Sequence, residues 1–266
     1  MVFNTRNFHF SEYNSFVERN HSSLFESIKT NICRFKKYYS SGEYITNDKI
    51  FNNFKFCIDK LNEPEEAKLR KSWILSACHM LRDAKLTREQ SIVLFNYSKE
   101  LSDNDLPVAD QEKSFDLLTH YRAIYVPGDG SCLFHSIAHQ VYARQVALLG
   151  TVTVAHYVRD EIADQLVKNM EKYKEKNLIL GDFDAYVSDI RKTRFWGGVP
   201  ECYAASDLYG VPVHVFTQYD KHFGEVLDVD GRALPSERYG SLINEPPIRL
   251  YYHKSHWMPI GLRDIE

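Results

Sequence analysis

The chain has 266 residues, of which 44% are hydrophobic and 26% charged, and its net charge is −3. This composition is typical of a soluble globular protein with one large or two modest domains, and the charge balance does not indicate a basic nucleic-acid-binding surface. No segment approaches the roughly 18 apolar residues of a membrane span, and the N-terminus lacks the apolar core of a signal peptide. We therefore expect no membrane partner and no nucleic-acid partner.

The five cysteines are scattered along the chain, and no two have CxxC spacing. Such a set predicts neither a disulfide framework nor a zinc site, so we expect no metal and no cofactor. A reducing compartment such as the cytoplasm fits this cysteine usage best. A bacterial effector or viral protein in a host cytosol is an alternative that the composition does not itself indicate.

Residues 1–105 are predicted to be mostly helical. Apolar residues recur with spacings of three and four over about 11–38, 47–61, 64–83 and 87–101. The stretch 102–107 is polar and ends in proline, which indicates a boundary. We therefore predict a helical accessory region at 1–105 and a second domain at 106–266.

The second domain is predicted to alternate helices and strands. Expected helices lie at about 109–120, 133–142, 154–173, 182–192 and 200–209. Expected strands lie at 123–126, 211–216, 248–252 and 256–262, with a hairpin at 223–234.

A glycine-rich turn between a predicted strand and a predicted helix places Cys132 at a helix N-terminus. Free backbone N–H groups and the helix dipole favour a thiolate there, and thiol pKa values fall from about 8.5 to about 3.5–7.5 in such settings. Gly128 and Gly130 permit positive φ, so the turn amides can converge on an oxyanion. The alternative is that Cys132 is a small buried hydrophobe beside a plain turn.

A nucleophilic thiol needs a base within hydrogen-bond distance, and a third polar group usually holds that base. His256 is favoured because it lies between two late strands and beside Trp257, which can shield the imidazole from water. His135 follows Cys132 on the same predicted helix but points along it, and is less suited. His253 and His256 make only a weak metal pair, because residues three apart in a strand face opposite ways.

Three segments occur in a fixed order. They are Gly128-Asp129-Gly130-Ser131-Cys132-Leu133-Phe134, then Trp196-Gly197-Gly198 with Glu201 and Ala204-Ala205-Ser206, then Ile248-x-Leu250-x-Tyr252-x-x-x-His256-Trp257. Together they resemble the OTU (ovarian tumour) family of cysteine proteases, which are mostly deubiquitinases. The resemblance covers about residues 107–263 and does not extend to 1–105.

The resemblance implies an α+β, OTU-like cysteine protease fold, with a central mixed β-sheet packed between helices and preceded by the helical N-terminal region. It makes Cys132 the nucleophile and His256 the general base, and the backbone amides of Asp129, Gly130 and Cys132 the oxyanion hole.

The family cleaves isopeptide bonds after the Gly-Gly tail of ubiquitin, so the site must admit an extended chain without side chains. The residues that could form the walls of this narrow channel are Trp196, Gly197, Gly198 and Trp257. For Trp196, packing in the core is an equally good interpretation.

One position departs from the family pattern. Many members have Asp or Asn two residues after the histidine, whereas this chain has Met258, which does not accept a proton from imidazole effectively. Either a Cys–His dyad suffices, or another group orients the ring. Asp129 is the first candidate and Asn244 another, and Asp129 could instead only shape its turn.

The sequence thus predicts a cysteine-type deubiquitinase that hydrolyses isopeptide bonds after ubiquitin or a ubiquitin-like modifier, with ubiquitin or polyubiquitin chains as partners. The alternative is a weak or inactive OTU-like module that binds ubiquitin. Residues 1–105 are expected to add a ubiquitin contact or to steer substrate choice.

Overall fold

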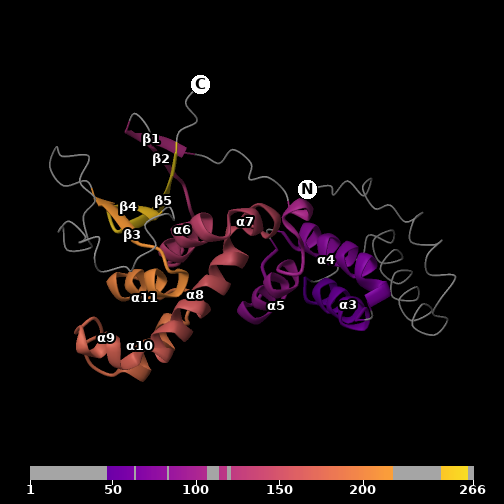
Figure 1. Cartoon of the computed structure of the whole chain (residues 1–266), viewed down its shortest axis with the longest axis horizontal. Coiled ribbons are helices and arrows are strands. Elements are labelled where there is room, and N and C mark those ends of the chain that lie inside the picture. The colour runs from indigo at the N-terminus through magenta and orange to yellow at the C-terminus, as the bar shows by residue number, and fades with distance from the viewer. Residues whose placement is uncertain are drawn as a thin grey trace. The chain divides into compact units, whose positions relative to one another are not determined.

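The computed structural model describes residues 47–62, 64–82, 84–106, 114–118, 121–217 and 247–262, and the chain divides into two compact units, Met1–Leu86 and Thr87–Glu266 (Figure 1). The predicted helix at 11–38, the predicted hairpin at 223–234 and the candidate Asn244 lie outside the described residues. Among the described residues, no helix is both long and apolar enough to cross a bilayer.

The first unit contains α3 (Asn47–Lys60), a short 3-10 helix (Pro64–Glu66) and α4 (Ala67–Leu81). α3 packs against α4, and Phe54 meets Trp73 edge to face with ring centroids 5.7 Å apart. The apolar spacing therefore predicted both helices correctly, because one face of each is buried. The buried apolar side chains are Phe51, Phe54, Cys57, Ile58, Ile74, Ala77, Cys78 and Leu81.

Helix α8 is the centre of the second unit. Val154, Val158, Ile162 and Leu166, which recur every four residues in the sequence, are fully buried, and α5, α6 and α11 all pack against α8. The helices of this unit are α5 (Arg88–Ser98), α6 (Cys132–Val141), α7 (Ala143–Leu149), α8 (Thr151–Lys168), α9 (Met170–Glu175), α10 (Phe183–Ile190) and α11 (Val199–Tyr209), with a 3-10 turn at Asp103–Asp105.

Helix α5 belongs to this second unit, although the sequence boundary at 105/106 placed it in the accessory region. Its start is a capping box, in which Thr87 Oγ1 accepts from the Gln90 N–H at 3.3 Å and Gln90 Oε1 accepts from the Thr87 N–H at 2.9 Å. Phe95 of α5 stacks on Tyr157 of α8 with ring centroids 3.8 Å apart. An accessory role for residues 1–105 stays a prediction.

In the part of the chain that the structure describes, five strands form one mixed sheet in the order β1-β2-β5-β4-β3. β3 is parallel to β4, and the other neighbouring pairs are antiparallel. α6 packs against β4 and β5, and α11 packs against β3, which confirms the predicted α+β architecture with a mixed sheet. The strands are β1 (Ser114–Leu118), β2 (Tyr121–Ile124), β3 (Val213–Thr217), β4 (Ile248–His253) and β5 (His256–Leu262).

The helix predicted at 109–120 is wrong over its described part. Residues 114–118 form β1, which pairs antiparallel with β2 and places Ser114 opposite Ile124. Over five residues, the sequence Ser-Phe-Asp-Leu-Leu fits a period of two as well as a period of 3.6. The choice between them is made by β2, whose backbone provides the hydrogen-bond partners of a strand.

Candidate active site

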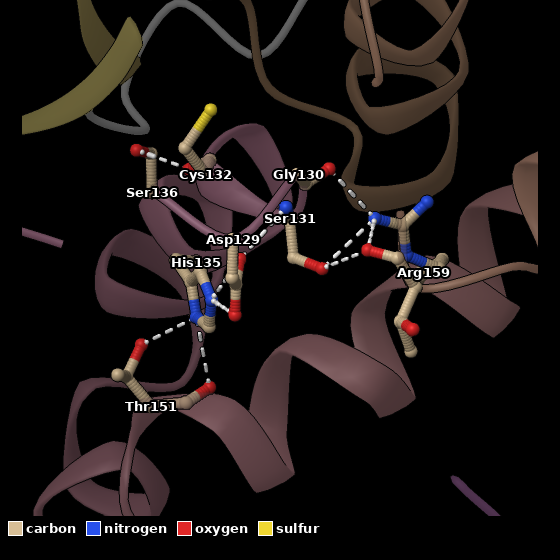
Figure 2. A network of polar contacts seen from close by, with 9 residues as sticks. Asp129, Gly130, Ser131, Cys132, His135, Ser136, Thr151 and Arg159 are labelled. Atoms are coloured by element: carbon tan, nitrogen blue, oxygen red, sulfur yellow. Dashed lines mark hydrogen bonds and ion pairs between the residues drawn. The ribbon is translucent and has the colours of Figure 1, made fainter. Parts of the chain in front are cut away.

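The glycine-rich turn is built as the sequence predicted, and Cys132 is the first residue of α6 (Figure 2). The Ser131 N–H donates to Asp129 Oδ1 at 2.9 Å, which closes the turn. Gly130 has a φ of 90°, and a Cβ built there would lie 3.1 Å from the Arg194 backbone. Glycine is therefore required at position 130 both by the backbone conformation and by the close approach of a second segment.

Cys132 sits where α6 meets β5. The backbone N–H groups of Trp257 and Leu133 favour the ionised form of its sulfur. Burial raises the pKa of the Cys132 thiol, these N–H groups lower it by less, and the Asp129 carboxylate raises it further. The net pKa lies above the ordinary value, which corrects the expectation that the helix N-terminus ionises this thiol: desolvation outweighs the backbone donors.

His256 begins β5, directly after a two-residue turn in which Lys254 and Ser255 have φ values of 49° and 61°. A Cβ built on Gly128 would lie 3.9 Å from His256 Cε1, so the nucleophile turn lies beside this ring. The structure thus brings Cys132 and His256 into one site. Since His253 is the cross-strand partner of His256, these two histidines flank the turn and do not share one strand.

The imidazole of His256 is hydrogen-bonded to the backbone of Val126. Burial lowers the pKa of His256, the bond to Val126 raises it by less, and the charges of His135 and Asp129 act in opposite directions. With its pKa below the ordinary value of about 6.5, the ring is neutral at pH 7 and has a nitrogen free to take a proton.

The Asp129 carboxylate points toward His135 (Figure 2). Its two oxygens lie 3.2 Å from His135 Nε2, while His135 Nδ1 lies 3.0 Å from Thr151 Oγ1. Burial raises the pKa of Asp129, but the hydrogen bonds from His135 and Ser131 outweigh it and lower the value to about 2. Within the described residues no hydrogen bond joins Asp129 to His256, although the Asp129 charge raises the pKa of His256.

Met258, at the position where an Asp or Asn was sought, is buried against Ala123, Tyr251 and Ile260. The polar partner of the His256 ring is instead the backbone at Val126. Sequence reasoning missed this partner because a main-chain group leaves no signal in residue type.

The two tryptophans of the predicted channel differ in exposure. The Trp196 side chain is 62% exposed, which overturns the interpretation that it packs in the core. Trp257 is buried, and its ring lies 4.6 Å from that of Tyr252.

The two glycines after Trp196 have different surroundings. A Cβ on Gly197 would lie 2.8 Å from Leu133 Cδ2, so this glycine permits close contact with α6, whereas a Cβ on Gly198 meets nothing within 4 Å. The Gly198 N–H donates to Glu201 at 2.7 Å, and Glu201, which is fully buried, also accepts from the Tyr186 hydroxyl at 2.7 Å. This network fixes the start of α11.

One buried charge near this turn escaped the sequence analysis. Arg159 of α8 is fully buried and reaches Gly130 and Ser131 (Figure 2). In the sequence, Arg159 is only a charged residue next to the apolar Val158 in a predicted helix. A solvent-exposed helix position gives the same pattern. Across the described ranges, no group of three or more His, Cys, Asp or Glu residues could hold a metal ion.

Residues 127–257 match the family model described as "OTU-like cysteine protease". The chain is 34% identical over 139 residues to "OVARIAN TUMOR DOMAIN-containing deubiquitinating enzyme 4" of Arabidopsis thaliana, a match that covers 51% of this chain and 41% of that protein. It is 31% identical over 128 residues to "OTU domain-containing protein 5" of Homo sapiens, covering 48% of this chain and 20% of that protein. The chain thus spans less than half the length of these relatives.

Among solved structures, the viral OTU domain protease from Taggert virus is similar with a TM-score of 0.44 and 17% identity, covering 58% of this chain and 87% of that chain. An OTU deubiquitinase from Wolbachia pipientis wMel is similar with a TM-score of 0.41 and 20% identity, covering 55% of this chain and 91% of that chain.

Proposed function

Through residues 127–257 the chain belongs to the family of OTU-like cysteine proteases, and from this premise we propose that it hydrolyses isopeptide bonds after the Gly-Gly tail of ubiquitin or a ubiquitin-like modifier. The observation that carries the proposal is the position of the His256 ring, whose Cε1 would lie 3.9 Å from a Cβ built on Gly128 in the turn that leads to Cys132.

The proposed reaction starts from a neutral thiol and a neutral imidazole. His256 takes the proton of Cys132 as the sulfur attacks the isopeptide carbonyl, and then gives it to the departing lysine amine, which leaves a thioester on Cys132. Water then attacks the thioester while His256 removes its proton, which releases the carboxylate of the modifier and regenerates the thiol. The raised pKa of Cys132 and the lowered pKa of His256 favour this starting state over a preformed ion pair.

The backbone amides of Asp129, Gly130 and Cys132 are the proposed oxyanion hole. The Ser131 N–H already donates to Asp129 Oδ1, so it is not the donor proposed for the oxyanion. This supports the choice of the amides on either side of it. These N–H groups belong to a turn whose shape is held by Gly130 at positive φ, so they need no reorganisation as charge develops on the carbonyl oxygen.

Trp196, Gly197, Gly198 and Trp257 are the proposed walls of the channel for the Gly-Gly tail. The exposed indole of Trp196 supports this role, as does the open space beside Gly198. A flat aromatic side chain beside a backbone without side chains can pack against an extended glycine pair.

Residues 1–105 are proposed to add a ubiquitin contact or to steer substrate choice, and removal of 1–86 should then change linkage preference. A cytoplasmic or other reducing location is proposed as well. It is supported by the described cysteines Cys57, Cys78, Cys132 and Cys202, all of which are free thiols.

The proposal is tested by incubating the wild-type chain and Cys132→Ala with the full set of differently linked ubiquitin dimers, and with ubiquitin bearing a C-terminal electrophile. Cleavage and covalent capture by the wild type alone are expected. If ubiquitin binds but neither cleavage nor capture occurs, the chain is instead a ubiquitin-binding module. The raised pKa of Cys132 and the apolar Met258 are the observations that favour this second candidate.

A further inference from the structure

Arg159 makes polar contacts with the turn before Cys132, as Figure 2 shows, and with the distant segment 190–195. Its Nη2 donates to the Gly130 carbonyl at 3.1 Å and to Ser131 Oγ at 3.0 Å. Its Nη1 donates to the carbonyls of Ile190 at 2.8 Å and Phe195 at 2.9 Å. One guanidinium therefore holds both the turn before Cys132 and the segment 190–195.

The two loops also contact one another at the same place. The Ser131 hydroxyl donates to the Thr193 carbonyl at 2.9 Å, and Arg159 Nη2 lies 3.3 Å from that oxygen. The Arg194 backbone lies 3.1 Å from the position of a Cβ on Gly130. The contacts thus end one residue before Cys132 on one side and one residue before Trp196 on the other.

A buried guanidinium is costly unless its donors are paired. Burial lowers the pKa of Arg159 to about 10, although the nearby carboxylates of Glu201, Asp129 and Asp160 raise it. The guanidinium therefore stays charged at pH 7. The Phe134 ring lies under the guanidinium, with its centroid 3.9 Å from Cζ. Of the nitrogens, Nε is without a hydrogen-bond partner, so the pairing is made through the two Nη atoms that reach the loops.

A lysine at this position would keep the charge but not the contacts. Arginine presents its donors in a rigid planar fork, whereas an ammonium is a compact point charge. In Arg159 two separate nitrogens bond the two segments, Nη2 the Gly130 carbonyl and Nη1 the Phe195 carbonyl, whereas a lysine has a single nitrogen.

We propose that Arg159 is a positioning residue that locks the Cys132 turn to the Trp196 segment, so that the thiol meets a carbonyl whose chain is bound beside the exposed indole. The inference rests on the proposed function for the identity of that substrate. Its structural core, the locking of the turn, can be measured without ubiquitin.

The test compares wild type, Arg159→Lys and the control Arg191→Gln. Arg191 is matched in residue type and neighbouring in space, but its side-chain bonds go to the carboxylates of Asp160 and Asp164. In Arg159→Lys we expect kcat on ubiquitin with a fluorogenic C-terminal leaving group to fall about 10- to 100-fold, while KM stays within about threefold of the wild-type value. Small misplacements of reacting groups lower the rate to this extent.

The second readout is alkylation of Cys132 by iodoacetamide, followed by peptide mapping. Release of the turn should expose the buried sulfur, so alkylation in Arg159→Lys should be several-fold faster than in wild type and in Arg191→Gln. A merely structural role would lower the melting temperature and leave both readouts unchanged once corrected for the folded fraction, and that result would overturn the proposal.

A second variant covers the case in which Arg159→Lys does not fold. Ser131→Ala removes the one hydroxyl that both loops share, and it should shift kcat and alkylation in the same directions by about fivefold. Unchanged values in this variant would also refute the lock. If the wild type cleaves no ubiquitin substrate, the proposed function fails while the alkylation comparison still decides whether Arg159 holds the turn.

Discussion

His135 Nε2 lies 3.2 Å from both carboxylate oxygens of Asp129, so the acid three residues before Cys132 is held by a buried histidine of the same helix. The sequence placed His135 near the nucleophile but not as its base. In the structure His135 stabilises the turn before Cys132 through its contact with Asp129. Any effect of Asp129 on His256 acts through space, since their hydrogen bonds go elsewhere.

Asp129→Asn and His135→Gln should lower kcat on ubiquitin substrates to a similar extent, about tenfold each. Because both variants break the same contact, that between Asp129 and His135, the double variant should be no slower than either single variant. The check is kcat and melting temperature for the four proteins of this cycle. If Asp129→Asn removes activity while His135→Gln is silent, Asp129 serves His256 directly.

The same contact predicts how stability depends on pH. The pKa of Asp129 is about 2 in the folded chain and about 3.9 when unfolded, so its stabilising effect is present above about pH 4 and disappears as pH falls toward 2. The free energy of unfolding of wild type should therefore drop more steeply over this window than that of Asp129→Asn. Urea denaturation at a series of acidic pH values measures the difference, and parallel curves would contradict it.

The pH profile of catalysis should reflect the neutral starting pair. Since the pKa of His256 is lowered, kcat/KM should lose its base on the acid side with a midpoint below about 6.5. Since the pKa of Cys132 is raised, its alkylation should be slow at neutral pH and should accelerate toward alkaline pH. Fast alkylation that is constant from about pH 5 to 8 would show a preformed thiolate instead.

Gly197→Ala and Gly198→Ala should have opposite consequences. A Cβ at 197 meets Leu133 Cδ2 at 2.8 Å and the Phe134 ring at 3.1 Å, so this variant should lose about 1–3 kcal/mol of unfolding free energy. Gly198→Ala adds its methyl in open space and should keep its stability within about 1 kcal/mol while raising KM, because the methyl enters the proposed channel. Urea denaturation and steady-state kinetics of the two variants give the comparison.

Trp196→Ala should raise KM about five- to tenfold and leave the melting temperature nearly unchanged, because an indole that is 62% exposed contributes little to folding. Trp257→Ala is the contrasting variant, since its buried ring should cost about 3–5 kcal/mol. A large loss of stability in Trp196→Ala would instead indicate that the Trp196 side chain packs in the core.

The sequence by itself determined the features that depend on near neighbours. The turn at Gly130, the start of α6 at Cys132 and the buried face of α8 follow from backbone sterics, helix ends and hydrophobic periodicity, which act within a few residues. The pairing of Cys132 with His256 followed instead from the resemblance of three ordered segments to the OTU family.

Only the tertiary structure decided the rest. Pairing with β2 made residues 114–118 a strand, and the main chain at Val126 took the place of an acid beside His256. Burial raised the pKa of Cys132, although its position at a helix N-terminus was expected to lower that pKa. The position of Arg159 between two loops belongs with these. Each depends on which distant groups come within a few ångströms and on how much water they displace, and neither quantity is encoded in residue type at one position.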